Sequence, residues 1–565
     1  MKHILDLLSH LSGISCEAEN LTTPPDPSMG DLSYRCFELA RELKKSPLRI
    51  AEDLAQKITP DSLIKSAVAS GPYLNFTLYR EGVLASVLET DVEKQNIGKG
   101  EVVVIDYSHP NIAKPFHFGH LRSTNIGADL ARMYEYLGYR VFRKNYLGDW
   151  GTQFGYVIYS WLKYGKKEIL EERAVDYLVE LYIQGMKDSE KDQKVTKKAR
   201  NYFSLLEAGD PEILQLWESF RSLSIKNFKE TYHRLGVHFD SYDGEASISP
   251  QIPGLVQRFK DAGLVKESDG ALIVDVGDLI GKPIPPLMLL KSDGSSTYAA
   301  RDCAEALDRW EKHGFHLNLY VVARQEDHFS QVFAALKKLS QAEGWETDWT
   351  DRCITVPFGY VRGMSTRRGK VIWLSDVLDE AKFRARGMRI EKQKTTSLEE
   401  VSEETLETLS EQIGQAALLY FDVSSLRKTD VSFDWNSALR FEGSTGPYLQ
   451  YAHARISGVF RKAESFPPND GKDEEPIEDS EWGVVLKLRK FNSEIEWAVQ
   501  CKEPFYLARY LYDLSSQFST FYQSCKVLNL DHLGTSYRRL QLCQSVQKTL
   551  ATGLRLLGIE PLDVM

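Results

Sequence analysis

Apolar and polar residues alternate between positions 101 and 155 in the pattern of a parallel α/β sheet. Val102–Ile105 is a short, wholly apolar run, which is typical of a buried strand. A loop with two prolines follows, and apolar side chains then recur from Leu121 to Leu137 at the spacing of one helix face. Gly138 is placed to end this helix, and 141–146 has the pattern of the next strand. Strand, loop, helix and strand in this order predict an α/β fold.

The first 98 residues have the pattern of a separate small α+β domain. Helical periodicity occurs at 3–12, 32–44 and 48–58. The alternation at 73–78 indicates a strand of a half-exposed sheet. We therefore expect an N-terminal α+β domain over 1–98.

A long insertion is expected within the α/β domain, which we place at 99–404. The insertion covers about 156–290, and it is helical and highly charged up to about 235. Asp-Gly pairs at 269–270 and 293–294 predict hairpins. Further strands are expected at 317–322 and 354–361. From 405 to 565 the pattern is almost wholly helical and predicts an all-α bundle.

Size, charge and cysteine usage restrict the class of protein. A chain of 565 residues is expected to form roughly three or four domains. The net charge of −10 disfavours a general nucleic-acid coat protein, although local basic stripes remain compatible with one selected RNA. Seven scattered cysteines without a CxxC pair indicate reduced thiols and disfavour a zinc ribbon. Because signal-peptide and membrane-spanning patterns are lacking, we expect a cytoplasmic protein without a membrane partner.

The tetrapeptide His117-Phe118-Gly119-His120 falls where the loop becomes the helix. The first turn of a helix favours an anion, and Gly119 removes a side chain where a ligand could approach the backbone. The position beyond the carboxyl end of a strand is where open α/β sheets bind ligands. This arrangement suits a nucleoside triphosphate. A chance HxxH pattern, or one half of a metal site, is the alternative.

A second loop, 362–370, carries basic and hydroxyl side chains between glycines. Such a loop can reach over phosphates, but exposed basic loops are common and the signal alone is weak. The helix that follows could either track an RNA backbone or face solvent. Its basic residues are Lys382, Arg384, Arg386, Arg389, Lys392 and Lys394.

Several stretches together resemble the arginyl-tRNA synthetases, a family of class I aminoacyl-tRNA synthetases. HFGH matches the HIGH motif, and Met364-Ser365-Thr366-Arg367 stands where KMSKS would be, in degenerate form. The stretches SHPNIAKPFHFGHLRST, NYLGDWGTQFG, TYAARD and FEGSTGPYLQYAHAR are similar to that family. DPSMGD at 26–31 and GPYLNF at 71–76 resemble its N-terminal domain, which contacts the tRNA elbow. The resemblance covers nearly the whole chain.

The resemblance implies a Rossmann-like catalytic domain and an all-α anticodon-binding domain. It implies ATP-dependent activation of L-arginine to arginyl-adenylate, followed by transfer to the terminal ribose of tRNA(Arg). ATP would be used with Mg²⁺, no zinc is expected, and the usual form of the family is a monomer. His117, Gly119 and His120 would bind ATP together with the second loop at Met364, Ser365, Thr366 and Arg367.

For the substrate arginine, the resemblance implies that Asp106 and Asp302 grip the guanidinium with Tyr298 alongside. Carboxylates in a fork geometry are the natural partners of this group, although Asp302 alone could also form an ordinary surface salt bridge. Asn111 and Gln325 would hold the backbone end. The loop around Gln325 is one residue shorter than usual, so Glu326 is the alternative.

The second lysine of KMSKS is absent, and Lys114 matches a lysine that many arginyl enzymes carry just upstream of HIGH. Our hypothesis is that Lys114 supplies the missing cation and joins His117 and His120 in catalysis.

For tRNA, the resemblance places five residues at anticodon-contacting positions. Aromatic side chains usually read unpaired RNA bases by stacking, but Tyr448 and Tyr451, three residues apart, could also belong to the core. The five residues are Tyr448, Tyr451, Arg455, Tyr510 and Met565.

Three alternatives remain to be weighed. A cysteinyl enzyme would need zinc at its substrate site, and clustered Cys/His ligands are lacking. A non-catalytic paralogue is disfavoured because both signature loops and both pocket acids are present. A small nucleotidyltransferase sharing HxGH would have no use for the insertion and the C-terminal bundle.

Overall fold

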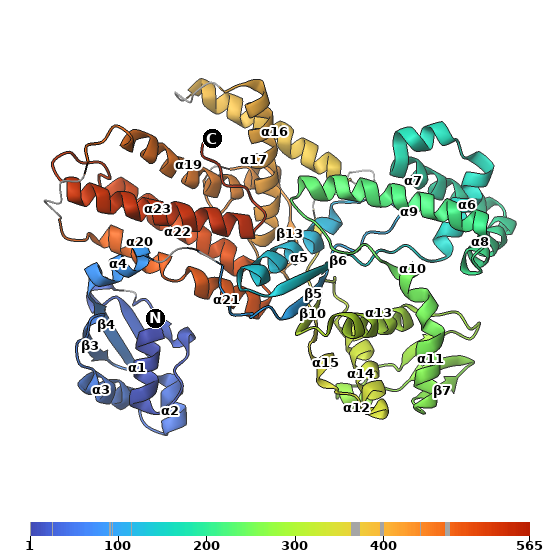
Figure 1. Ribbon diagram of the computed structural model, residues 1–565, viewed down its shortest axis with the longest axis horizontal. Coiled ribbons are helices and arrows are strands. Elements are labelled where there is room, and N and C mark those ends of the chain that lie inside the picture. The colour runs from blue at the N-terminus through green and yellow to red at the C-terminus, as the bar shows by residue number, and fades with distance from the viewer. Residues whose placement is uncertain are drawn as a thin grey trace. The chain divides into compact units, whose positions relative to one another are not determined.

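The computed structural model describes residues 2–24, 26–89, 92, 94–114, 116–362, 373–395, 401–440, 442–468 and 475–565. The chain forms two compact units (Figure 1). One unit comprises 1–92, 460–490 and 516–548, and the other comprises 93–459, 491–515 and 549–565. This division into two units does not test the domain boundaries at 98 and 404, which stay predictions.

The first unit is built on an antiparallel sheet with the strand order β1-β2-β4-β3. The predicted strand at 73–78 is confirmed as β4, and the predicted helix at 3–12 is confirmed as α1. The helix predicted over 32–44 is wrong in its first part, because Leu32–Arg35 forms strand β2. β2 lies between β1 and β4, and this inner position buries Leu32 and Tyr34. The elements are α1 (Lys2–Ser12), β1 (Leu21–Thr22), β2 (Leu32–Arg35), α2 (Phe37–Leu43), α3 (Pro47–Lys57), β3 (Ile64–Ser70), β4 (Tyr73–Leu78), α4 (Arg80–Glu89) and α20 (Asp479–Leu488).

The second unit contains a parallel sheet with the strand order β11-β10-β5-β6. Its strands are β5 (Val102–Asp106), β6 (Arg140–Lys144), β10 (Leu317–Tyr320) and β11 (Cys353–Thr355). The predicted unit of strand, loop, helix and strand is confirmed, with α5 (Gly119–Tyr136) as the crossover. Asp106 ends β5, level with Lys144 of β6 and Tyr320 of β10, and so lies at the carboxyl edge of the sheet.

Helix α5 is fixed along its length to later parts of the same unit. Arg122 Nη2 donates to the backbone oxygen of Arg427 at 3.1 Å, and Asn125 Nδ2 donates to that of Leu419 at 3.0 Å. Arg132 Nε donates to the backbone oxygen of Leu556 at 3.1 Å. The helix that begins at HFGH is therefore held from both ends by the C-terminal third of the chain.

The insertion is helical up to Arg234, as the sequence predicts. Its helices are α6 (Thr152–Tyr164), α7 (Lys167–Lys191), α8 (Gln193–Glu207) and α9 (Pro211–Arg234). The hairpin predicted at 269–270 is confirmed as β7 (Val265–Ser268) and β8 (Ala271–Val274), which β9 (Leu287–Leu290) extends. At 293–294 the turn forms, but only an isolated bridge joins Leu290 to Ser296. Thr297 then caps a helix, α13 (Tyr298–His313), in place of a second strand.

The strand predicted over 354–361 is shorter than expected. Only Cys353–Thr355 joins the parallel sheet, and Pro357, which has no N–H to donate, follows. Val361–Arg362 forms a separate strand, β12, that pairs with β13. The C-terminal region is mainly helical, as predicted. The remaining elements are α10 (Glu245–Ile248), α11 (Ile252–Asp261), α12 (Gly277–Ile280), α14 (Glu326–Glu343), α15 (Asp348–Asp351), α16 (Leu374–Thr395), α17 (Glu403–Val423), β13 (Val431–Ser432), α18 (Trp435–Ala438), α19 (Gly446–Ala463), α21 (Phe491–Cys501), α22 (Phe505–Ser524), α23 (Leu533–Leu556) and three short 3-10 helices at Ala18–Asn20, Pro27–Met29 and Ser249–Gln251.

The basic helix of the sequence is α16, and acids of α16 and α17 take up several of its charges. Lys382 pairs with Glu407 at 2.6 Å, and Arg386 pairs with Glu403 at 2.6 Å. Arg384 pairs with Glu380 of its own helix. These contacts favour a helix-packing role for the three cations. In the described part of the chain, helices that are both long and apolar enough to cross a membrane are lacking.

Candidate active site

The HFGH tetrapeptide lies at the start of α5, as predicted. The rings of His117 and His120 are 4.0 Å apart between centroids. The backbone N–H of Gly119 donates to His117 Nδ1 at 3.1 Å. A Cβ atom at Gly119 would lie 2.8 Å from Cε1 of His117, so a larger residue would displace this ring. The glycine thus leaves room for the ring of His117 in this position.

Both histidines are uncharged at neutral pH. Burial lowers the pKa of His117, and burial together with His117 lowers the pKa of His120 to about 3. The rings can donate hydrogen bonds to phosphate oxygens but bring no positive charge. If phosphates bind here, other groups would have to balance their charge.

The second predicted loop, with Met364, Ser365, Thr366 and Arg367, lies outside the described residues. Its flanks are informative. Trp373 forms an antiparallel bridge with His117, and the backbone N–H of Leu374 donates to the oxygen of Phe116 at 2.9 Å. The chain leaving the second loop therefore meets the HFGH segment directly.

Lys114 lies in the loop between β5 and α5, half-buried. Its Nζ is 5.9 Å from the ring centroid of Tyr182 in the insertion. Burial lowers the pKa of Lys114, and Glu245 opposes this shift. Lys114 thus lies on the segment that leads into HFGH.

The loop between β5 and α5 is held in an uncommon backbone conformation. Ser108, His109 and Ala113 have φ values of 81°, 54° and 55°, which non-glycine residues rarely adopt. Side chains from elsewhere hold it: Ser123 accepts from the N–H of Ser108, and Ser224 accepts from that of Ala113. Strain that is held in this way is characteristic of functional sites.

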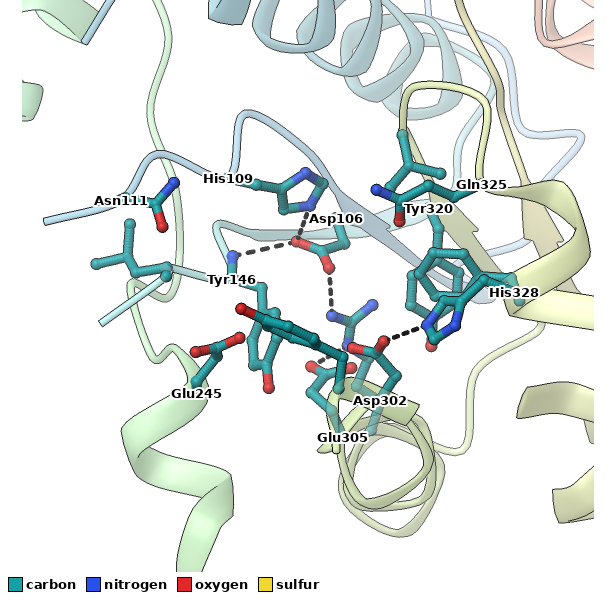
Figure 2. A pocket seen from close by; sticks show the side chains of 16 residues that line it. Asp106, His109, Asn111, Tyr146, Glu245, Asp302, Glu305, Tyr320, Gln325 and His328 are labelled. Atoms are coloured by element: carbon teal, nitrogen blue, oxygen red, sulfur yellow. Dashed lines mark hydrogen bonds and ion pairs between the residues drawn. The ribbon is translucent and has the colours of Figure 1, made fainter. Parts of the chain in front are cut away.

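A cavity of about 450 Å³ opens at the carboxyl edge of the parallel sheet. Figure 2 shows that its lining side chains come from β5, β10, α10, α13 and α14 and the adjoining loops. All five residues predicted to bind arginine line it. These are Asp106, Asn111, Tyr298, Asp302 and Gln325. Gln325 is the N-cap of α14 and faces the cavity, whereas the alternative, Glu326, is not among the lining residues.

Asp106 is fully engaged by groups of the protein itself. Its Oδ2 accepts from Arg309 Nη2 at 2.5 Å, and its Oδ1 accepts from His109 Nε2 at 2.9 Å and from the backbone N–H of Tyr146 at 3.2 Å. Burial alone would raise the pKa of Asp106, but Arg309 and His109 hold it below the usual range. The sequence predicted the position of Asp106 but not these partners.

Two other acids face the cavity from opposite sides, Glu245 and Asp302 (Figure 2). Asp302 Oδ2 lies 2.6 Å from His328 Nε2. Glu245 lies 3.6 Å from Arg301 Nε, and burial raises the pKa of Glu245 to about 7 although Arg301 opposes the shift. Glu245 is thus a carboxyl group that a cationic ligand would ionise.

Asn111 is placed by a close backbone contact. It forms a bridge with Gly148, where a Cβ atom would lie 2.4 Å from Asn111 Oδ1. The absence of a side chain at Gly148 leaves room for the Asn111 amide at the cavity wall.

Several lining residues were missed by sequence reasoning. Glu305 and Arg309 recur on the same face of α13 as the predicted Asp302, a spacing that is readable once the segment is predicted as a helix. Glu245 stands alone before a four-residue helix and gives no periodic signal. The other missed lining residues with polar side chains are His109, Tyr146, Tyr320 and His328.

The residues predicted to contact tRNA fall into two groups. Tyr448, Tyr451 and Arg455 lie half-buried on α19, with Arg455 Cζ 4.7 Å from the ring centroid of Tyr451. Tyr510 and Met565 are only 3% and 5% exposed. Tyr510 and Met565 therefore present little surface to an RNA in this structure.

In the part of the chain that the structure describes, groups of three or more His, Cys, Asp or Glu side chains suited to a metal ion are lacking. The cavity thus has acids on separate walls and no preformed cluster.

Comparison with known proteins agrees with this arrangement. Residues 83–435 match the family described as tRNA synthetases class I (R), catalytic domain; residues 2–78 match the arginyl tRNA synthetase N terminal domain; residues 449–565 match the DALR anticodon binding domain. The chain is 37% identical to an arginine–tRNA ligase of Halothermothrix orenii over 96% of this chain and 95% of that one. It is 36% identical to one of Clostridium perfringens over 98% of each chain.

Solved structures show the same fold. The Thermus thermophilus arginyl-tRNA synthetase matches over 100% of both chains with a TM-score of 0.83 and 24% identity. The Plasmodium falciparum arginyl-tRNA synthetase matches over 100% of this chain and 99% of its own, with a TM-score of 0.79 and 25% identity. By its catalytic domain, its flanking domains and its full-length relatives, the chain belongs to the arginyl-tRNA synthetases, the class I arginine–tRNA ligases.

Proposed function

We propose that this arginine–tRNA ligase holds the guanidinium of L-arginine between Asp302 and Glu245. The observation that carries the proposal is that these two acids face one cavity from opposite walls. A guanidinium is planar and presents donors along several edges, so it can meet both. Tyr298, at the cavity mouth and 69% exposed, would cover the side chain.

Asn111 and Gln325 would hold the amino-acid backbone at the end of the cavity nearer to HFGH. Asp106 would act through its partners, because its carboxylate already binds Arg309 and His109. A lysine side chain could not pair with both Asp302 and Glu245 in this way, and the unpaired acid would favour arginine over lysine as the substrate.

ATP would bind at the N-terminus of α5. The helix dipole and the neutral rings of His117 and His120 would stabilise charge on the α-phosphate, and Gly119 would allow close approach. The carboxylate of arginine attacks the α-phosphate, and pyrophosphate leaves with the electron pair of the broken P–O bond. Mg²⁺ would be bound through the phosphates of ATP.

The second loop, with Met364, Ser365, Thr366 and Arg367, would bind ATP together with the HFGH segment. Lys114 would supply the cation that this loop lacks. Pyrophosphate exchange by Lys114→Ala and Lys114→Arg tests this role: we expect a loss in the first and a partial recovery in the second. A near-normal rate for Lys114→Ala would contradict it.

The partner that accepts the arginyl group would be tRNA(Arg), through its terminal ribose. Tyr448, Tyr451 and Arg455 of α19 would contact unpaired anticodon bases by stacking. The match of 449–565 to an anticodon binding domain supports this placement. We propose that the protein works in the cytoplasm as a monomer.

Arginine-dependent ATP–pyrophosphate exchange, with and without tRNA, tests the proposed binding mode. Asp302→Asn should raise the KM for arginine at least tenfold, because the bound guanidinium loses one charged partner. Glu311→Gln, on the same helix but outside the cavity, is the matched control and should change little. Equal KM values for the two variants, or exchange with cysteine in place of arginine, would overturn the proposal.

A further inference from the structure

The cavity that takes an arginine already contains one. Arg309 of α13 lines it and is only 3% exposed. Its Nη2 donates to Asp106, its Nε to Glu305 and its Nη1 to Asn318. Its Cζ lies 4.7 Å from the ring centroid of Tyr320. This guanidinium thus contacts two carboxylates, one amide and one tyrosine ring.

The acids of the cavity form two pairs that differ in depth. The side chains of Asp106 and Glu305 are each 3% exposed, whereas those of Asp302 and Glu245 are 20% and 11% exposed. Along α13, Asp302 and Glu305 are one turn apart. Asp106 and Glu305, the deep pair, therefore lie further into the cavity than Asp302 and Glu245, the pair proposed to bind the substrate.

Charge at the deep pair is balanced within the protein. Arg309 contacts both acids, and Lys144 Nζ lies 4.0 Å from Glu305. Two carboxylates, one guanidinium and one ammonium meet at this floor, and the imidazole of His109 is a further partner of Asp106. Removal of Arg309 takes away one positive charge, and buried anions that lose a counter-charge attract a cation strongly.

We propose that Arg309 is a specificity-determining residue that fixes how deeply the substrate side chain enters the cavity. The proposal rests on the placement of the substrate guanidinium between Asp302 and Glu245. Arg309 occupies the deep acids and repels a second guanidinium, which is a repulsive element of the kind that specificity requires. The substrate stops at the upper pair, with its carboxylate at the HFGH end.

The length of the side chain is the property that this arrangement would select. If the floor were negative, arginine would be drawn downward and its carboxylate would withdraw from the α-phosphate. L-Homoarginine, which is one methylene longer, could reach the floor while its carboxylate stayed in place. Removal of the Arg309 charge should therefore favour the longer substrate.

The test compares the KM for L-arginine with the inhibition constant of L-homoarginine in pyrophosphate exchange. We expect Arg309→Met to shift the ratio of the two constants about tenfold towards homoarginine. The double variant Arg309→Met/Glu305→Gln has the same space, but it loses one negative charge together with the positive one. We expect its ratio to return close to that of the wild type.

An unchanged ratio in Arg309→Met would overturn the proposal, because Arg309 would then have no influence on the preferred length of the substrate. An equal shift in the single and double variants would also overturn it, because the shift would then come from the space that the smaller side chain leaves and not from the lost charge. If Arg309→Met fails to fold in a thermal melt, Arg309→Gln and Arg309→Gln/Glu305→Gln decide, because glutamine also removes the charge but keeps a hydrogen-bond donor. A shift that the second substitution reverses supports the proposal, and an unchanged ratio in Arg309→Gln contradicts it. Failure of the wild-type chain to activate arginine would count against the proposed function instead.

Discussion

Trp373 pairs with His117 across an antiparallel bridge, and next to it the N–H of Leu374 donates to the oxygen of Phe116. The exit of the second loop and the entrance of α5 are thus one piece of local structure. A displacement of one segment is transmitted to the other through backbone contacts.

A single substitution can remove one hydrogen bond from this contact. Leu374 is the first residue of α16, where proline is tolerated, so Leu374→Pro removes the N–H donor while the helix persists. Leu374→Ala loses the same buried side chain but keeps the donor. Since one hydrogen bond contributes about 1 kcal/mol, we expect kcat of exchange to be about fivefold lower in the proline variant than in the alanine variant. Equal kcat values would show that the contact does not matter for catalysis.

Arginine binding should depend on pH through Glu245. Burial raises the pKa of its carboxyl group to about 7 in the empty cavity, and a bound guanidinium requires the ionised form. Below that pH the carboxyl group of Glu245 must lose a proton when arginine binds. The dissociation constant for arginine should therefore rise up to about tenfold for each unit by which the pH is lowered. Calorimetric titration between pH 5.5 and 8.5, the range flanking this value, measures it. Glu245→Gln should bind arginine more weakly and with a flatter pH profile; an unchanged slope would exclude Glu245 as the titrating group.

Asp129 should make the fold less stable above neutral pH. Its carboxyl group is fully buried in α5, and burial raises its pKa to about 7 although Arg132 opposes the shift. Because the folded pKa exceeds the unfolded value, the penalty is absent below about pH 4 and complete above about pH 7.

We expect Asp129→Asn to raise the free energy of unfolding by about 2 kcal/mol at pH 8 and by much less at pH 4. Urea denaturation at both pH values gives the comparison. A variant that is destabilised equally at both would show that the ion pair with Arg132 outweighs the burial of charge.

Gly148→Ala tests the position of Asn111. The new methyl group would lie 2.4 Å from Asn111 Oδ1, so the amide must move from the cavity wall. We expect the KM for arginine to rise about tenfold, the equivalent of one hydrogen bond to a charged group. Gly254→Ala, in α11 with no neighbouring atom within 4 Å, is the control and should leave KM unchanged.

The α19 tyrosines and Tyr510 should behave differently on substitution. Loss of a stacked base costs about 1–3 kcal/mol, so Tyr451→Ala should raise the KM for tRNA at least fivefold without loss of stability. Tyr510 is buried against Phe491, with ring centroids 5.8 Å apart, and Tyr510→Ala should lower the melting temperature instead. Filter binding and thermal denaturation separate the two effects. A selective loss of tRNA affinity in Tyr510→Ala would instead support the predicted RNA contact.

The sequence was most informative where a signal is local. The apolar run at Val102–Ile105 and the helix after HFGH are set by neighbouring residues, and both form as predicted. Leu32–Arg35 was predicted as helix because its pattern continues into α2, but its strand is decided by pairing with β1 and β4.

In the candidate site, the five residues predicted to bind arginine do line one cavity, but the sequence did not predict their partners. Asp106 was expected to meet the substrate directly, and it is occupied by Arg309 from a distant helix. Glu245 was missed altogether. Ion pairs of this kind depend on the tertiary arrangement of β5, α10 and α13, which no local pattern contains.

The fixing of α5 has a consequence for the order in which the enzyme matures. The backbone oxygens that hold Arg122, Asn125 and Arg132 belong to residues beyond position 418. During synthesis from the N-terminus, His117 and His120 emerge from the ribosome long before these acceptors exist. Contacts between residues so far apart in the chain form slowly. Helix α5 should thus acquire its final rigidity as one of the last events of folding, after the C-terminal third of the chain has been made.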